Sequence, residues 1–119
     1  MAWSFTSNKP VYLQLAERIT KSILSGKYAP GQQIPSVRQL ALIAAVNPNT
    51  VQHAFTELEY EGIIVSKGTM GRYVTEDTQI IDICRKRMAQ QFVIDFMENM
   101  KQLSLSEEDV MNMIKEVTK

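Results

Sequence analysis

Four polar side chains that can hydrogen-bond to the edges of nucleic-acid bases occur close together near the middle of the chain. They are Asn49, Thr50, Gln52 and His53. Asn and Gln can each form two hydrogen bonds with adenine, and Thr and His can reach bases or phosphates. This pattern favours a helix that reads double-stranded DNA. The alternative is a helical hairpin whose polar face is only solvated.

Helix-start signals place these side chains on the second of two short helices. Ser36 is followed three residues later by Gln39, a pattern in which the two side chains cap a helix N-terminus. Asn47-Pro48 is an N-cap residue followed by proline at the first helical position, and Gly62 ends that helix. Apolar residues at helical spacing give each helix one buried face. A break of about three residues between two helices predicts a helix-turn-helix, whose second helix enters a DNA major groove.

Further elements are predicted on both sides of this pair. Apolar residues recur every four positions over 10–25, which predicts another helix. A loose arm precedes it, in which Trp3 and Phe5 are apolar enough to dock on the protein's own body rather than on a ligand. Residues 63–75 contain two β-prone runs and a loop with two glycines, which predicts a hairpin. An isolated hairpin is marginal in water, so it must pack against the helices as a wing. The alternative is a plain β-turn in which Lys67 and Arg72 are merely solvated.

The segment from Pro10 to Val74 resembles the winged-helix DNA-binding domain of the GntR family of bacterial transcription regulators. The matching residues, in chain order, are Pro10-Val11-Tyr12-Leu13-Gln14-Leu15, Ser25-Gly26-Lys27-Tyr28, Pro30-Gly31, Ile34-Pro35-Ser36-Val37-Arg38-Gln39-Leu40-Ala41, Val46-Asn47-Pro48-Asn49-Thr50-Val51, Leu58-Glu59-Tyr60-Glu61-Gly62 and Gly71-Arg72-Tyr73-Val74. The resemblance covers more than half of the chain.

The resemblance implies DNA contacts from both paired helices and from the wing. Arg38 would contact a phosphate or a guanine, the start of the second helix would read bases, and residues 68–72 would form a wing tip in the minor groove. The chain departs from the family at His53, where many members have Arg, which implies a weaker and pH-sensitive contact. It departs again at the Gly-x-Gly tip, whose first glycine stands one place early. The expected DNA-binding residues are Ser36, Arg38, Asn47, Asn49, Thr50, Gln52, His53, Lys67, Gly68, Thr69, Gly71 and Arg72.

A change of composition at Glu76 predicts a separate two-helix tail. Apolar residues at three-to-four spacing over 81–103 predict one long amphipathic helix, and Ser106 with Asp109 opens a second. Two such helices cannot bury their apolar surface alone, which indicates an association site. The expected homodimer interface contains Ile81, Cys84, Met88, Phe92, Phe96, Met100, Val110, Met113 and Ile114. The alternatives are a methionine-lined ligand cavity and a docking surface for another protein.

This short tail resembles that of the YtrA-type subfamily, in which two helices mainly make the dimer. That resemblance implies a repressor of an operon encoding an ABC transporter. It also implies a homodimer on an inverted-repeat operator in double-stranded DNA, and it leaves a small-molecule effector open.

Composition and charge fit this interpretation. The chain has 119 residues and a net charge of zero, but residues 1–75 carry seven basic and four acidic side chains, so one end suits phosphates. There is neither a membrane-length apolar run nor a signal peptide, so we expect a cytoplasmic protein without a membrane partner. Cys84 is the only cysteine, which excludes an internal disulfide and a cysteine-based zinc cluster.

An enzyme is not expected, because the single histidine, His53, has no carboxylate pair or phosphate-binding loop around it. Neither a cofactor nor a metal ion is expected. The sequence therefore predicts a mainly α (α+β) protein, with a winged helix-turn-helix DNA-binding domain over 1–75 and a two-helix dimerisation or effector tail over 76–119. The predicted function is sequence-specific transcription regulation. The alternative is a winged helix that binds RNA or another protein.

Overall fold

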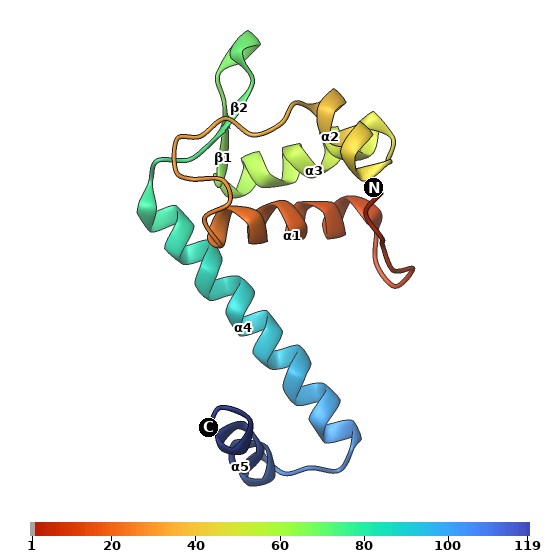
Figure 1. The fold of residues 1–119 in the computed structure, drawn as a ribbon, viewed down its shortest axis with the longest axis vertical. Helices are drawn as coiled ribbons and strands as arrows, with labels where there is room; N and C mark the ends of the chain where they lie inside the picture. Colours follow the sequence, from red (N-terminus) through yellow and green to blue (C-terminus); the bar gives the residue numbers. More distant parts are fainter. Residues whose placement is uncertain (1) are drawn as a thin grey trace. The chain divides into compact units, whose positions relative to one another are not determined.

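The computed structural model describes residues 2–119, most of which are helical (Figure 1). In chain order the elements are α1 (Val11–Leu24), α2 (Val37–Ala44), α3 (Pro48–Glu61), β1 (Ile64–Ser66), the 3₁₀ helix η1 (Gly68–Met70), β2 (Arg72–Val74), α4 (Thr78–Gln102) and α5 (Glu107–Val117). The chain divides into two units, one that extends to Ile83 and one that comprises Cys84–Lys119. Helix α4 begins in the first unit and continues in the second. The predicted mainly α fold with a small hairpin wing is confirmed.

The predicted caps set the limits of α2 and α3. The Gln39 N–H donates to Ser36 Oγ at 3.1 Å, and the Ser36 N–H donates to Gln39 Oε1 at 2.9 Å, which completes the capping box. Asn47 Oδ1 accepts the Asn49 N–H at 2.8 Å, and Pro48 occupies the first helical position of α3. Gly62 ends α3 in the left-handed region, with φ of 82°. These local bonds fix where the predicted reading residues begin.

The core of the first unit lies between α3 and its neighbours. Helix α3 packs against both α1 and α2, and Figure 1 shows α1 and α3 side by side. Leu15 of α1 and Val51, Phe55 and Leu58 of α3 are fully buried. Burying a side chain of this size contributes about 1.5–3 kcal/mol, so this contact holds α3 in place. The opposite face of α3 is left free for polar side chains.

The wing has a third backbone segment that the sequence did not indicate. Strands β1 and β2 pair antiparallel, with Ile64 opposite Val74 and Ser66 opposite Arg72. On the outer side of β2, the Ile34 N–H donates to the Arg72 carbonyl at 3.0 Å, and the Val74 N–H donates to the Gln32 carbonyl at 2.8 Å. Residues 31–34 therefore cover the edge of β2 and stabilise a hairpin that would be marginal alone.

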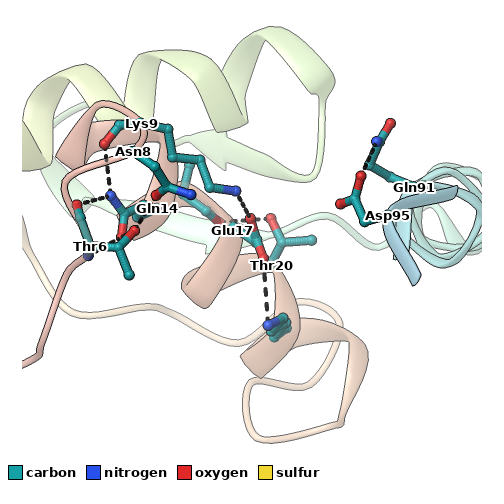
Figure 2. A network of polar contacts seen from close by, with 10 residues as sticks. Thr6, Asn8, Lys9, Gln14, Glu17, Thr20, Gln91 and Asp95 are labelled. Carbon is teal, nitrogen blue, oxygen red and sulfur yellow. Dashed lines mark hydrogen bonds and ion pairs between the residues drawn. The ribbon is translucent and has the colours of Figure 1, made fainter. Parts of the chain in front are cut away.

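The N-terminal arm is tied to α1, in contrast to the loose arm that we expected (Figure 2). The Thr6 N–H donates to Gln14 Oε1 at 2.9 Å, and Gln14 Nε2 donates to the carbonyls of Thr6 and Lys9 at 2.8 and 2.7 Å. Lys9 Nζ lies 3.1 Å from Glu17 Oε2. The predicted docking of Trp3 is confirmed by a distance of 4.0 Å between its ring centre and the guanidinium carbon of Arg18.

The second unit contains the remainder of α4, a short turn and α5. The predicted cap of α5 is confirmed, because the Asp109 N–H donates to Ser106 Oγ at 3.1 Å and the Ser106 N–H donates to Asp109 Oδ2 at 3.0 Å. Ser104 in the turn has a φ of 61°. No helix of the described chain combines the length and apolar character needed to span a membrane.

Candidate nucleic-acid interface

The first two turns of α3 present the predicted base-reading side chains to solvent. Asn49, Gln52 and His53 are exposed and Thr50 is half-buried, while Val51 of the same turn is fully buried. A helix anchored by one apolar face and open on the other matches the geometry of a helix that lies in a DNA major groove. Asn47 is also exposed, but its side-chain oxygen caps the helix.

A shallow groove between α2 and the wing brings two of the predicted cations together. Arg38 on α2 and Arg72 on β2 both line it, together with Ser36, Gln33 and Gly71. Its other lining residues are Tyr28, Gln32, Ile34, Pro35, Val37, Gln39 and Phe55. None of the lining side chains is a carboxylate, so the exposed cation of Arg38 suits a contact with a phosphate backbone. Arg38 is exposed, whereas the side chain of Arg72 is 24% exposed.

Arg72 is directed at α3 and does not extend from the wing tip. Its Nε–H donates to Glu59 Oε1 at 2.8 Å, and its Nη2 lies 3.5 Å from Gln52 Oε1. Its guanidinium carbon lies 5.1 Å from the centre of the Phe55 ring. Sequence reasoning grouped Arg72 with Lys67 as a free cation of the wing, because the sequence carried no signal that a glutamate thirteen positions earlier would face it.

His53 stacks on a tyrosine that sequence reasoning did not include in the site. The rings of His53 and Tyr12 lie 3.5 Å apart between centres, with an angle of 7° between their planes. Tyr12 belongs to α1 and is half-buried, while His53 is exposed on α3. The stack leaves one face of the imidazole covered, so a neighbouring helix restricts the direction in which His53 can reach a partner.

The wing tip is a short 3₁₀ turn with two glycines at positive φ. Gly68 has φ of 63° and Gly71 has φ of 100°. A Cβ at Gly71 would lie 2.8 Å from Gln33 Nε2, which itself donates to the Met70 carbonyl at 2.8 Å. The backbone angle therefore favours glycine, and a Cβ here would also displace the Gln33 amide from its hydrogen bond. Lys67 and Thr69 are exposed beside it, and Lys67 Nζ lies 4.5 Å from the centre of the Tyr73 ring.

The residues predicted to form a dimer interface differ in their exposure. Ile81, Cys84 and Val110 are buried, whereas Met88 and Met100 are half-buried. The exposed members are Phe92, Phe96, Met113 and Ile114. The structure adds Ile94, which is 51% exposed and lines an apolar depression with Ala89, Gln90 and Val93. Sequence reasoning missed Ile94 because it falls outside the three-to-four spacing of the expected stripe.

The described residues show no arrangement for metal chemistry. Within residues 2–119, no three His, Cys, Asp or Glu side chains are close enough to hold a metal ion. The pKa of one carboxyl is shifted from its ordinary value. Hydrogen bonds from the backbone N–H and the side chain of Ser106 lower the pKa of Asp109. The Asp109 carboxylate completes the capping box of α5 and is exposed.

Comparison with known proteins gives consistent matches. The sequence model of the family described as "Bacterial regulatory proteins, gntR family" matches residues 11–74. The HTH-type transcriptional regulator YhcF of Bacillus subtilis strain 168 is 34% identical over 114 residues, which cover 96% of this chain and 94% of that protein. The HTH-type transcriptional repressor YtrA of the same organism is 42% identical over 73 residues, which cover 61% of this chain and 56% of that protein.

Two solved structures extend these matches to three dimensions. A GntR family transcriptional regulator from Listeria monocytogenes aligns with a TM-score of 0.86 and 35% identity, over 94% of this chain and 98% of that one. The DNA-binding domain of AraR in complex with operator ORX1 aligns with a TM-score of 0.57 and 26% identity, over 63% of this chain and 95% of that one.

Proposed function

This chain belongs to the GntR family of bacterial regulatory proteins, and we propose that it represses transcription as a homodimer bound to an inverted-repeat operator. It is a DNA-binding transcription regulator and not an enzyme. The repressor assignment is supported by its similarity to the repressor YtrA. We extend the proposal to an operon that encodes an ABC transporter, on subfamily resemblance. A protein that acts on bacterial chromosomal DNA works in the cytoplasm, which is the location that we propose.

The observation that carries the proposal is the exposed polar face at the start of α3. Asn49 and Gln52 project from a helix whose other face is buried against α1 and α2. We propose that they read base edges and that Arg38 sets the register through the backbone. The wing tip and Lys67 add contacts in the minor groove or to phosphates.

The homodimer is supported by the apolar surface of the second unit. Phe92 and Phe96 of α4 are 44% and 41% exposed, and Met113 and Ile114 of α5 are 49% and 41% exposed. Fully burying such a side chain is worth about 1.5–3 kcal/mol, so their exposure in one chain is costly. A second copy would cover the surface symmetrically, and two-fold symmetry in the protein matches an inverted repeat in DNA.

The test is selection of bound fragments from a random pool of double-stranded DNA with the full-length protein. We expect enrichment of an inverted repeat, and Asn49→Ala and Gln52→Ala should each relax the preference at one base position per half-site. The loss should be about 1–3 kcal/mol of discrimination for each bidentate contact. Tyr60→Ala is the matched control, because Tyr60 is exposed at the other end of the same helix.

Three outcomes would contradict the proposal or a part of it. A pool without any enriched sequence would favour the alternative of a winged helix that binds RNA or protein. If Asn49→Ala and Gln52→Ala both kept the site preference of the wild type, α3 would not be the element that reads the bases. Enrichment of a single half-site without its repeat would contradict the homodimer alone.

A further inference from the structure

The side chain of Arg72 crosses from the wing to the reading helix along one face of α3. Gln52, Phe55 and Glu59 are three and four positions apart and therefore lie on the same side of the helix. Arg72 touches all three: its Nε–H donates to Glu59 at 2.8 Å, its guanidinium carbon lies 5.1 Å from the Phe55 ring, and its Nη2 lies 3.5 Å from Gln52 Oε1. The guanidinium thus connects the wing to a predicted base-reading residue.

Arg72 is held at both ends, so its position is well defined. Its backbone pairs with Ser66 across the hairpin, and its carbonyl accepts the Ile34 N–H at 3.0 Å from the other side. Its charged head is fixed by Glu59, whose side chain is 32% exposed. A planar guanidinium can serve two partners at once, because its five N–H donors point in fixed directions.

We infer that Arg72 is a positioning residue that orients the Gln52 amide for base reading. The inference rests on the proposed function, in which Gln52 contacts a base. An amide presents an oxygen that accepts and an NH₂ that donates, and a rotation of half a turn exchanges the two. Arg72 has only donors, so it holds the oxygen side of Gln52 and leaves the NH₂ side pointing away from the wing.

A fixed amide discriminates between bases better than a rotating one. The Gln52 oxygen keeps a second lone pair, so it can accept from adenine N6 while its NH₂ donates to adenine N7. An amide free to rotate could also place its NH₂ at the position where its oxygen meets adenine N6, and guanine, which has the O6 acceptor at that position, would then be bound as well. The contact with Arg72 therefore narrows the set of bases that Gln52 accepts.

This role differs measurably from a phosphate contact. A lysine or arginine that neutralises a phosphate releases counterions, and its removal lowers the salt dependence of binding by about one unit. The charge of Arg72 is already paired with Glu59. Lys67 is exposed on the same wing, with Tyr73 as its neighbour, and serves as the matched control for loss of a wing cation.

Arg72→Lys is the informative variant. A lysine keeps a cation for Glu59, but one ammonium cannot span Glu59 and Gln52 together. In selection from random DNA, preference at the base position read by Gln52 should fall at least about fivefold, the lower end of what a bidentate contact contributes. The other positions and the salt slope should stay unchanged. Lys67→Ala should show the converse, a lower salt slope with the same base preference.

A double variant separates positioning from a general structural effect. In Gln52→Ala, the added Arg72→Lys should change preference at that position no further, whereas a structural defect would weaken binding in both backgrounds. If Arg72→Lys lowers the melting temperature, Glu59→Ala is the second test: it removes the acceptor that anchors the guanidinium and should reproduce the loss of base preference. A salt slope lower by about one unit, with base preference retained in Arg72→Lys, would overturn the inference. A base preference that falls in Gln52→Ala but stays unchanged in Arg72→Lys would also overturn the inference. If Gln52→Ala itself has no effect, the base-reading proposal fails.

Discussion

Individual side chains at the start of α3, where we propose that bases are read, differ in the contacts that hold them. Asn49 is exposed with its backbone N–H bonded to the Asn47 cap, whereas His53 is stacked on Tyr12 of another helix. A side chain held in place before binding loses less conformational entropy when it contacts a partner. We therefore expect His53 to make a directed contact at the edge of the DNA interface.

Substitution of Tyr12 tests this expectation. Tyr12→Ala removes the stack, so affinity for the selected operator should fall, by up to about tenfold for an aromatic pair worth 0.5–1.5 kcal/mol. Tyr12→Phe keeps the ring and should bind like the wild type. Operator affinity measured by fluorescence anisotropy would check both variants. Equal affinity for Tyr12→Ala and Tyr12→Phe would mean that the stack does not assist DNA binding.

Among the structural elements, the turn between α2 and α3 contains an unusual backbone position. Ala45 ends α2 in the left-handed region, with φ of 58° and ψ of 48°. Residues with a Cβ pay about 1–2 kcal/mol for this conformation, whereas glycine does not. Glycine also gives the unfolded chain more conformational entropy, which offsets part of the stability gained by relieving the strain.

Ala45→Gly should therefore raise the free energy of unfolding by about 0.5–1 kcal/mol. Ala44→Gly is the neighbouring control: Ala44 is the last helical residue of α2 and is buried, so the same change there should lower stability by at least about 1 kcal/mol. Thermal unfolding followed by circular dichroism would measure both. An unchanged or lower melting temperature for Ala45→Gly would contradict the strain at the turn.

The cap of α5 makes this helix sensitive to acid. The Ser106 hydrogen bonds lower the pKa of Asp109 in the folded chain. A carboxyl with a depressed folded pKa stabilises the fold above its unfolded pKa, and this contribution is lost as the pH falls through the folded pKa. Asp109→Asn should remove that part of the acid sensitivity, because an amide does not titrate. Helix content measured against pH for both proteins would check this, and parallel titration curves would contradict it.

For the whole molecule, the proposed dimer links association to DNA affinity. Phe92→Glu with Phe96→Glu should place charges on the exposed apolar surface and leave a monomer in sedimentation. Affinity for an inverted repeat should then fall on the order of a hundredfold, because the two half-site contacts are no longer coupled. Affinity for an isolated half-site should be unchanged. Tyr60→Glu is the control, since Tyr60 is 89% exposed in the first unit, at the opposite end of α3 from Asn49.

A wild-type protein that sediments as a monomer at tens of micromolar would contradict the dimer, because operators are bound at concentrations far below this. The exposed apolar surface of α4 and α5 would then serve another protein.

Elements whose signals are local could be predicted from the sequence. The caps at Ser36, Asn47 and Ser106 each depend on residues within three positions, and the structure confirms all three. The end of α3 at Gly62 depends on a single residue with the required backbone freedom. The fold class and the position of α3, the proposed reading helix, followed from these signals and from family resemblance.

The features that could not be predicted all join distant parts of the chain. Residues 31–34 pair with β2, Tyr12 stacks on His53, and Arg72 bonds to Glu59. None of these residue types requires its partner, because tyrosine, histidine and arginine are equally compatible with solvent on a helix or strand. Only the packing of α1 on α3 and of the wing beside α3 brings them together.

The stack of Tyr12 on His53 has a consequence for how such a regulator diverges after gene duplication. A copy that acquires a small side chain at position 53 leaves the Tyr12 ring without its partner, and a copy that first loses the ring leaves the imidazole unsupported. Either single step passes through an intermediate with a poorer interface. A recognition helix grafted from a paralogue should therefore bind best when its residue at position 53 can stack on Tyr12, as a guanidinium can and a small side chain cannot.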